Sequence, residues 1–301
     1  QDIPIDFFAF DEHYIKLNSQ KNIANSSFFG SAVYNTHNFP GNLDSIDIDS
    51  LNNSFNTISY YRVGLERISN GTCIYGYYNF TFKKKFFIHL YPRIVNDVNL
   101  FDRYSGLPRD KKRGGFSSGE VDIAGIGYKS TNGFIHIGRG RQGWGSSENA
   151  QLVLSNTSAS YDHILLGFNF GNLHTRYMHG FLESLSNGVN RYIVARGFEY
   201  KNDNSSSFGI SEIVIYSGYN RPIDFSYINP IANHLEIEMN DRHNLAGTGS
   251  NNAVWEISLN KNVKQNLLFS VNFIIDELVL DKSERDNGKS NGLGGSIRVL
   301  Y

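Results

Sequence analysis

Cysteine, proline and tryptophan are all scarce in this chain, which has 301 residues but only one cysteine, six prolines and two tryptophans. A single thiol cannot form a disulfide within the chain, so a disulfide-stapled scaffold is excluded. Cys73 lies in a Thr-Cys-Ile-Tyr pattern, and we predict that it is a small apolar strand residue. The few prolines leave room for many uninterrupted strands.

Charge is also limited. Charged residues make up 19% of the chain and the formal net charge is -1. No basic excess is available to neutralise phosphates, so we expect no nucleic-acid partner. No apolar run approaches the roughly 18–20 residues of a membrane helix. The five histidines His163, His174, His179, His234 and His243 show no tight metal-ligand spacing, and we expect neither a metal nor a cofactor.

The chain is rich in residues that form strands and turns. It contains 29 glycines, 18 tyrosines and 22 phenylalanines, a mixture that favours many strands joined by polar turns. From Ser54 onward, apolar and polar residues alternate, as in 57–67 and 71–82. A basic turn, Lys83–Lys85, separates the second of these runs from a strand beginning at Phe86, which is a hairpin signal.

The predicted strands are long. Later strands are expected near 120–128, 133–142, 150–155, 163–170, 174–182, 191–200, 208–217, 233–238, 253–259, 267–280 and 294–301. The predicted length of about 8–12 residues is closer to the roughly 9–11 residues of a membrane-spanning strand than to the roughly 5–6 residues of an ordinary strand. We therefore predict an all-β protein: an antiparallel transmembrane β-barrel with roughly a dozen or more strands and a polar lumen. The barrel would span 54–301, after an N-terminal segment, 1–53, of irregular structure or edge strands in which 7–17 forms a short helix or an edge strand.

Several charged residues lie inside otherwise apolar strands. Arg196, Glu199 and Glu212 each lie within two residues of Ile, Val, Phe or Tyr, and Arg139, Arg141, Asp276 and Glu277 are also in predicted strands. A barrel with a lipid-facing outside and a wet inside accommodates such charges routinely. They would either bind acidic sugar in the lumen or form a structural ladder of Arg–carboxylate pairs. The ladder explains the near-zero net charge without a ligand.

Four stretches, in order along the chain, resemble the Wzi-type capsule-assembly family of bacterial outer-membrane β-barrels. Residues 137–156 are similar to its Gly-Arg strand, Trp-Gly turn and Leu-rich strand. Residues 190–200 resemble its Arg-Tyr…Arg-x-x-Glu strand, with Ala195-Arg196 in place of His-Arg. Residues 208–230 resemble its signature ending in Tyr-Leu-Asn-Pro, here Tyr-Ile-Asn-Pro, and 269–280 resemble its acidic strand. These stretches lie within about half of the chain.

The resemblance implies a location in the outer membrane and a non-enzymatic, lectin-like role in assembly or attachment of capsular polysaccharide or exopolysaccharide. Expected partners are surface polysaccharide, outer-membrane lipid and lipopolysaccharide, and other envelope proteins. The residues expected to line the lumen or bind polysaccharide are Arg139, Arg141, Trp144, Arg196, Glu199, Glu212, Arg221, Asp276 and Glu277. The family's barrel would continue after the acidic strand, so we expect either a shorter barrel or further strands.

Aromatic and basic residues outside this set have two interpretations each. Trp144, Tyr216, Tyr219, Tyr227 and Trp255 would stack on sugar rings or form an interfacial aromatic girdle. The basic clusters 83–85 and 109–113 would contact lipopolysaccharide phosphates or acidic capsule, or be plain solvated loops.

Two other functions stay open. A substrate-diffusion porin would need an open lumen lined by opposed Arg and Glu residues. A laminarinase-like β-sandwich glycosidase is suggested by the Gly-Glu-x-Asp sequence at 119–122, with Glu120 as nucleophile and Asp122 as helper. Retaining glycosidases need a second carboxyl group as acid/base. Position 125, where it would lie, is glycine, so we predict that the protein is not an enzyme.

Overall fold

The computed structural model describes residues 27–35, 57–68, 70–83, 85–101, 104–144, 151–155, 158–202, 206–244, 251–264, 267–277, 286–288 and 290–300. The chain divides into two compact units, Gln1–Thr131 and Asn132–Tyr301. Most of the predicted N-terminal segment 1–53, including 7–17, lies outside the described residues.

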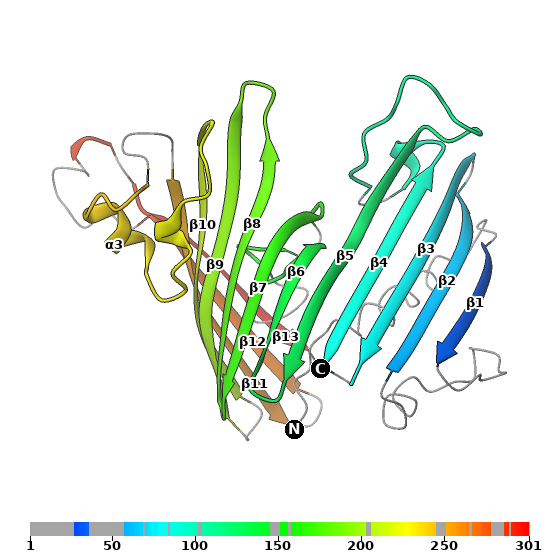
Figure 1. Cartoon of the computed structure of the whole chain (residues 1–301). Helices are drawn as coiled ribbons and strands as arrows, with labels where there is room; N and C mark the ends of the chain where they lie inside the picture. Colours follow the sequence, from blue (N-terminus) through cyan, green and yellow to red (C-terminus); the bar gives the residue numbers. More distant parts are fainter. Residues whose placement is uncertain are drawn as a thin grey trace. The chain divides into compact units, whose positions relative to one another are not determined.

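The first unit is an antiparallel meander in which strand order follows the sequence (Figure 1). Its strands are β1 (Ser27–Asn35), β2 (Thr57–Ile68), β3 (Gly71–Phe82), β4 (Phe86–Val95) and β5 (Ser118–Ser130). A short 3-10 helix, η2 (Val98–Leu100), follows β4. Each strand pairs with the next in the sequence. Cys73 is buried in β3, as predicted for a small strand residue.

The second unit is a longer meander of the same kind. Its strands are β6 (Gly133–Gly140), β7 (Tyr161–Phe170), β8 (Leu173–Ser184), β9 (Val189–Asn202), β10 (Ser206–Tyr219), β11 (Asn251–Lys264), β12 (Leu267–Glu277) and β13 (Gly292–Leu300). Between β10 and β11 lie a 3-10 helix, η3 (Phe225–Tyr227), and a short helix, α3 (His234–Met239). Figure 1 shows α3, in yellow, beside β9 and β10.

The prediction of an all-β, antiparallel protein is confirmed, and the described strands number thirteen. The described residues contain only short helices, and none of these is long and apolar enough to cross a membrane. In neither unit does a ladder join the first strand to the last, so the described residues do not form a closed sheet.

Two predicted strands are wrong. Residues 233–238, predicted as a strand, form α3, because the Asn233 side chain accepts a hydrogen bond from the Glu236 amide (2.8 Å) and so caps a helix. His234 and Ile237, three residues apart, are both buried, as one face of a helix requires. Residues 150–155 were expected to form a strand, but the described part of this stretch contributes only an isolated bridge between Trp144 and Leu154.

The strands of the second unit have one face whose apolar side chains are exposed. This exposed face is defined by the cross-strand register of β6 to β13. Its exposed apolar residues are Ile135, Ile137, Ile164, Phe168, Phe170, Leu173, Phe181, Phe198, Tyr200, Phe208, Ile257, Leu259, Phe273, Leu293, Ile297 and Val299. The opposite, covered face mixes small, polar and apolar residues that are buried, such as His163, Leu165, Ala195, Glu256 and Asn272.

The first unit has the same sidedness. In β4, Phe86, Ile88, Leu90 and Ile94 are exposed, whereas the intervening side chains from Phe87 to Val95 are buried. The register places Val63, Phe82, Val121 and Ile126 on the exposed side as well. In both units, therefore, one sheet face is apolar and exposed and the other is buried.

Close contact between β9 and β10 at Gly197 leaves no room for a larger residue, which allows the strand register to be tested. A Cβ atom there would lie 2.6 Å from the carbonyl oxygen of Ile210 and 2.7 Å from Cβ of Ser211. We expect Gly197→Ala to lower the free energy of unfolding by about 1–3 kcal/mol, since the clash involves backbone. Gly76→Ala is the matched control, because its Cβ would meet Pro92 at an ordinary 3.4 Å. Equal unfolding curves for the two variants would contradict the described register.

Candidate functional site

A group of buried polar residues lies on the exposed face of β8 to β10, beneath the chain that follows β10. We call residues 220–244 the covering segment; it contains η3 and α3. Tyr227 and Ile237 of this segment are fully buried against Val194, Val214 and Tyr216 of the strands. The segment thus packs on part of the exposed face and removes that part from solvent.

The centre of the group is an ion pair between Arg196 of β9 and Glu212 of β10. The two residues are direct cross-strand partners, and Nε of Arg196 lies 2.7 Å from Oε2 of Glu212. Their side chains are only 6% and 4% exposed. A buried pair is tolerated when further hydrogen bonds satisfy both ions.

Those further hydrogen bonds come from the covering segment. Nη1 of Arg196 donates to the carbonyl oxygen of Asn229 (3.1 Å), and Oε1 of Glu212 accepts from the backbone N–H of His234 (2.9 Å). The ion pair therefore joins two strands and also fastens the segment to them.

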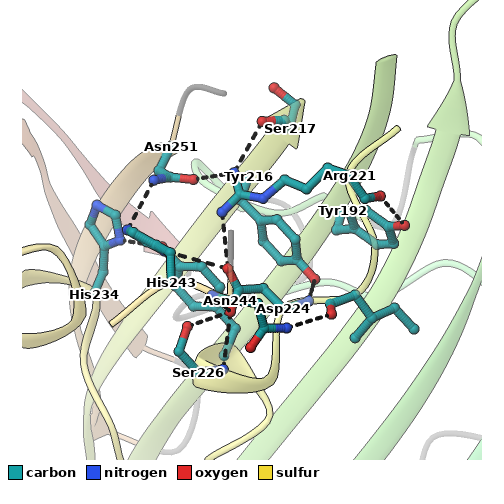
Figure 2. Close-up of polar contacts among 12 residues, drawn as sticks. Tyr192, Tyr216, Ser217, Arg221, Asp224, Ser226, His234, His243, Asn244 and Asn251 are labelled. Carbon is teal, nitrogen blue, oxygen red and sulfur yellow. Dashed lines mark hydrogen bonds and ion pairs between the residues drawn. The ribbon is translucent and has the colours of Figure 1, made fainter. Parts of the chain in front are cut away.

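A second ion pair fixes the start of the segment. Arg221 and Asp224 are both buried, and Nη2 of Arg221 lies 3.1 Å from Oδ2 of Asp224 (Figure 2). Nη1 of Arg221 also donates to the Ser217 carbonyl (3.0 Å) and to Oδ1 of Asn251 (2.7 Å). The guanidinium carbon lies 4.8 Å from the centre of the Tyr216 ring, within cation–π range.

The other oxygen of Asp224 caps η3. Oδ1 accepts hydrogen bonds from the Ser226 backbone N–H (3.1 Å) and hydroxyl (2.7 Å), and the Asn244 N–H also points to it. Burial alone would raise the pKa of Asp224, but the hydrogen bonds from Ser226, Arg221 and Asn244 together hold that pKa below its ordinary value. Asp224 is therefore a permanently charged anchor at neutral pH.

Four aromatic rings stack in a column through the group. Ring centres are 4.8 Å apart between Tyr192 and Tyr216, 4.8 Å between Tyr216 and Tyr227, and 6.0 Å between Tyr227 and His234. The planes of successive rings differ by 18° or less. The column crosses from β9 through β10 into the segment, so it adds stacking to the polar anchors.

The ring hydroxyls are hydrogen-bonded as well. Tyr192 donates to the carbonyl of Arg221 (2.9 Å) and Tyr177 to that of Tyr227 (3.0 Å), while the Tyr227 hydroxyl lies 2.8 Å from Nδ1 of His234. Burial raises the pKa of Tyr227 and lowers the pKa of His234, so the tyrosine and the histidine are neutral at pH 7. Most polar atoms of the group are hydrogen-bonded, but Nη2 of Arg196 and Nε of Arg221 are buried without a hydrogen-bond partner.

The structure brings together three of the nine predicted site residues, Arg196, Glu212 and Arg221. Arg196 and Glu212 were expected in a polar lumen, but the register places them on the face that carries the exposed apolar side chains. They are nearly inaccessible there because the covering segment lies over them. Their pairing is the Arg–carboxylate interaction that the sequence predicted as an alternative to ligand binding.

The remaining predicted residues are scattered. Arg139 pairs with Asp162 (3.2 Å), also on the exposed face, and Glu199 pairs with Lys201 (3.2 Å) on the covered face. Asp276 accepts a hydrogen bond from Asn252 (3.1 Å). The side chain of Glu277 is outside the described part of the structure. These charges do not form one site.

Arg141 and Trp144 lie in the chain after β6, which folds onto the covered face. Nε of Arg141 donates to the Ser158 carbonyl (2.8 Å). Trp144 is buried, with the guanidinium carbon of Arg176 4.3 Å from its ring centre. Stacking of Trp144 on a sugar would require this cation to move.

Of the other aromatic candidates, Tyr216 and Tyr227 are fully buried and thus available neither to a sugar nor to an interfacial girdle, whereas Tyr219 is exposed. Trp255 is half-buried in β11. Lys83, Lys85 and residues 109–113 are exposed in turns and loops, in agreement with their predicted position.

The carboxylates proposed for a glycosidase belong to a separate cluster in the first unit. Arg93 forms ion pairs with Glu120 and with Asp122, and its Nη2 lies 3.2 Å from Oδ2 of Asp122. The other Glu120 oxygen accepts from the N–H (2.8 Å) and hydroxyl (2.6 Å) of Ser105. Both carboxylates are nearly inaccessible, an arrangement typical of a structural ion pair.

Several residues of the group were missed by sequence analysis, notably Asp224, Asn229 and His234. Two local signals point to them. Asp224 precedes Phe-Ser as an N-cap residue, and Asn233 is followed three residues later by Glu236, which is the spacing of a capping box. The partners across the sheet carry no such signal.

No family model, curated protein or solved structure gave a significant match to this chain. Among the residues that the structure describes, no group of three or more His, Cys, Asp or Glu side chains is placed to hold a metal ion.

A double-mutant cycle tests the central ion pair. We expect Arg196→Met and Glu212→Gln each to lower the free energy of unfolding by about 3–5 kcal/mol, since each leaves one buried partner uncompensated. The double variant should lose less than the sum, as measured by denaturant unfolding. The exposed pair of Arg191 and Glu183 is the control, and there about 0–1 kcal/mol is expected. Additive losses at Arg196 and Glu212 would show that the pair is not formed.

The lowered pKa of Asp224 predicts how the segment responds to acid. The unfolded-state pKa of aspartate is about 3.9, and that of the folded state is lower. Its stabilising contribution is therefore present above the unfolded value and is lost as the pH falls through the folded value. Hydrogen exchange of amides 225–244, corrected for intrinsic rates, should accelerate over that range. Asp224→Asn should remove this acid dependence while weakening protection at pH 7. An unchanged pH profile in the variant would contradict the role of Asp224.

Proposed function

We propose that this chain is a non-enzymatic outer-membrane β-barrel protein that assembles or attaches capsular polysaccharide or exopolysaccharide at the cell surface. The observation that carries the membrane part of the proposal is the exposed apolar face of both units. The polysaccharide role is supported by the ordered resemblance of 137–280 to the Wzi-type family.

The exposed face is difficult to reconcile with an aqueous environment. Soluble monomers rarely expose a contiguous apolar patch larger than a few hundred Å². Here the exposed apolar side chains extend over neighbouring strands, as from Ile137 of β6 to Ile164 of β7 and Phe181 of β8. Alternation of exposed apolar and covered side chains is the pattern of strands that face lipid.

Strand length supports the same environment. The strands of the second unit contain between 8 and 14 residues, and about 9–11 are needed to cross a bilayer at the usual tilt. Because lipid does not tolerate open sheet edges, the proposal requires the membrane-inserted form to be a closed barrel.

The chain after β6 favours a binding or anchoring protein over a diffusion porin. Gln142 lies 3.2 Å from Nε2 of His163 and accepts a hydrogen bond from Arg176 (3.3 Å), and both partners are on the covered face. Trp144 covers the same arginine. Side chains that fill this part of the covered face oppose an open, water-filled lumen there.

A charge placed on the exposed face tests the membrane proposal. In lipid, Ile164→Arg should lower the free energy of unfolding by about 2–4 kcal/mol, whereas the same change on a water-facing surface stays within about 0.5 kcal/mol. Leu107→Arg, in an exposed loop, is the control and should have no effect in either case. The measurement is urea unfolding of protein folded into phosphatidylcholine vesicles.

The native protein should also fractionate with the outer membrane and migrate differently on a detergent gel before and after boiling. Recovery as a soluble protein, with Ile164→Arg as stable as the control, would overturn the membrane proposal. The polysaccharide role is tested separately, by surface retention of capsular polysaccharide in cells lacking the gene. Normal retention would leave the barrel without that role.

A further inference from the structure

The outer surface of the covering segment is apolar. Six large side chains point away from the buried group, with exposed fractions between 41% and 89%. They are Ile223, Phe225, Ile228, Ile231, Leu235 and Met239. They come from the chain just before η3, from η3, from α3 and from the chain between the two helices, so the surface belongs to the segment as a whole.

This surface is held in place rather than loosely attached. The segment is fastened by Arg196, Glu212 and Arg221 through the hydrogen bonds described above, and its own Tyr227 and Ile237 are completely buried against the strands. The six apolar side chains are exposed on this anchored segment.

The apolar surface lies on the same side of the sheet as the exposed apolar strand residues. The segment packs on Val194 of β9 and Val214 of β10. Along β9, Phe198, on the same face as Val194, is exposed. The surface of the segment therefore continues the exposed face.

Two ion pairs form within the segment, whereas Glu238 and Asp241 are exposed on it. Arg221 pairs with Asp224 (3.1 Å), and Arg242 binds both carboxylate oxygens of Glu236 (2.7 and 2.8 Å). Pairing reduces the free-energy cost of holding ions near an apolar medium. Glu236, in the first turn of α3, binds Arg242 after the helix, and Asn240 donates to the Glu236 carbonyl, so these polar groups lie beside the apolar side chains of α3.

We propose that the covering segment lies in the bilayer, with its six apolar side chains against lipid acyl chains and the Arg196–Glu212 ion pair shielded beneath it. This inference rests on the proposed membrane function and adds to it. It explains how a charged pair is accommodated on a lipid-facing strand surface, where an uncovered arginine would be costly. The occupant of the surface is thus acyl chain, the same medium that contacts the strands.

Lipid-borne quenchers test the inference. Single cysteines would be introduced at three exposed apolar positions in a Cys73→Ser background, labelled with an environment-sensitive fluorophore and folded into phosphatidylcholine vesicles with brominated acyl chains. The positions are Ile231 in the segment, Ile164 on the strand face and Leu107 in a loop of the first unit. All three side chains are exposed, so the substitutions leave the core intact.

We expect the label at 231 to be quenched as strongly as that at 164, and the label at 107 to be quenched little. Quenching at 164 but not at 231 would overturn the segment inference and leave the membrane proposal intact. Absence of quenching at both would overturn both. A third outcome is a label at 231 that is not quenched by lipid but whose emission indicates an apolar surrounding, to an extent that grows with the amount of protein per vesicle. That outcome would assign the surface to a second copy of the chain and overturn the lipid assignment.

Discussion

The two-residue period of long antiparallel strands is the constraint on which the rest of this structure depends. Consecutive side chains point to opposite faces, so a strand that alternates in sequence divides its residues between two environments. In β4 of the first unit and β7 of the second, most side chains on one face are apolar and exposed, and most of those on the other face are buried. The repetition of this division in two separately described units makes it a property of the chain and not of one local cluster.

One part of the exposed face carries charged side chains instead of apolar ones, and their partners are visible in the structure. Arg196 and Glu212 occupy positions where neighbouring strand residues are apolar. They are stabilised by each other, by a carbonyl and an N–H of the covering segment, and by an aromatic column that spans strands and segment. The ion pair holds the segment in place, and the segment keeps the ion pair away from the surroundings. Neither is stable alone in that position.

The sequence predicted the strands because their signal is local. Residues 163–170 and 191–200 were expected as strands, and β7 (Tyr161–Phe170) and β9 (Val189–Asn202) contain them. The charges in strands were expected either to bind acidic sugar or to form Arg–carboxylate pairs, and Arg196 and Glu212 form such a pair. Alternation did not reveal which face each charge occupies, because a two-residue period fixes only that neighbouring side chains lie on opposite faces.

The covering segment was harder to predict because its structure depends on distant partners. Residues 233–238 contain enough apolar residues for a short strand, and their helix is set by the Asn233 cap and by burial of Ile237 against β10. Glu212, whose carboxylate accepts the His234 N–H, lies 22 residues earlier. Contacts of this separation have no local pattern, so single-sequence analysis identified the strand charges but not the segment that covers them.

The most direct test of the account is an accessibility scan along β7. Spin labels would be placed in turn at each position from 162 to 168 in protein folded into lipid vesicles, and their collision rates with oxygen and with a water-soluble nickel complex would be compared. Labels at 164, 166 and 168 should favour oxygen, which concentrates in lipid, and labels at 163, 165 and 167 should not. A scan without this two-residue alternation, or with the nickel complex favoured at 164 and 168, would contradict the claim that the exposed face meets lipid.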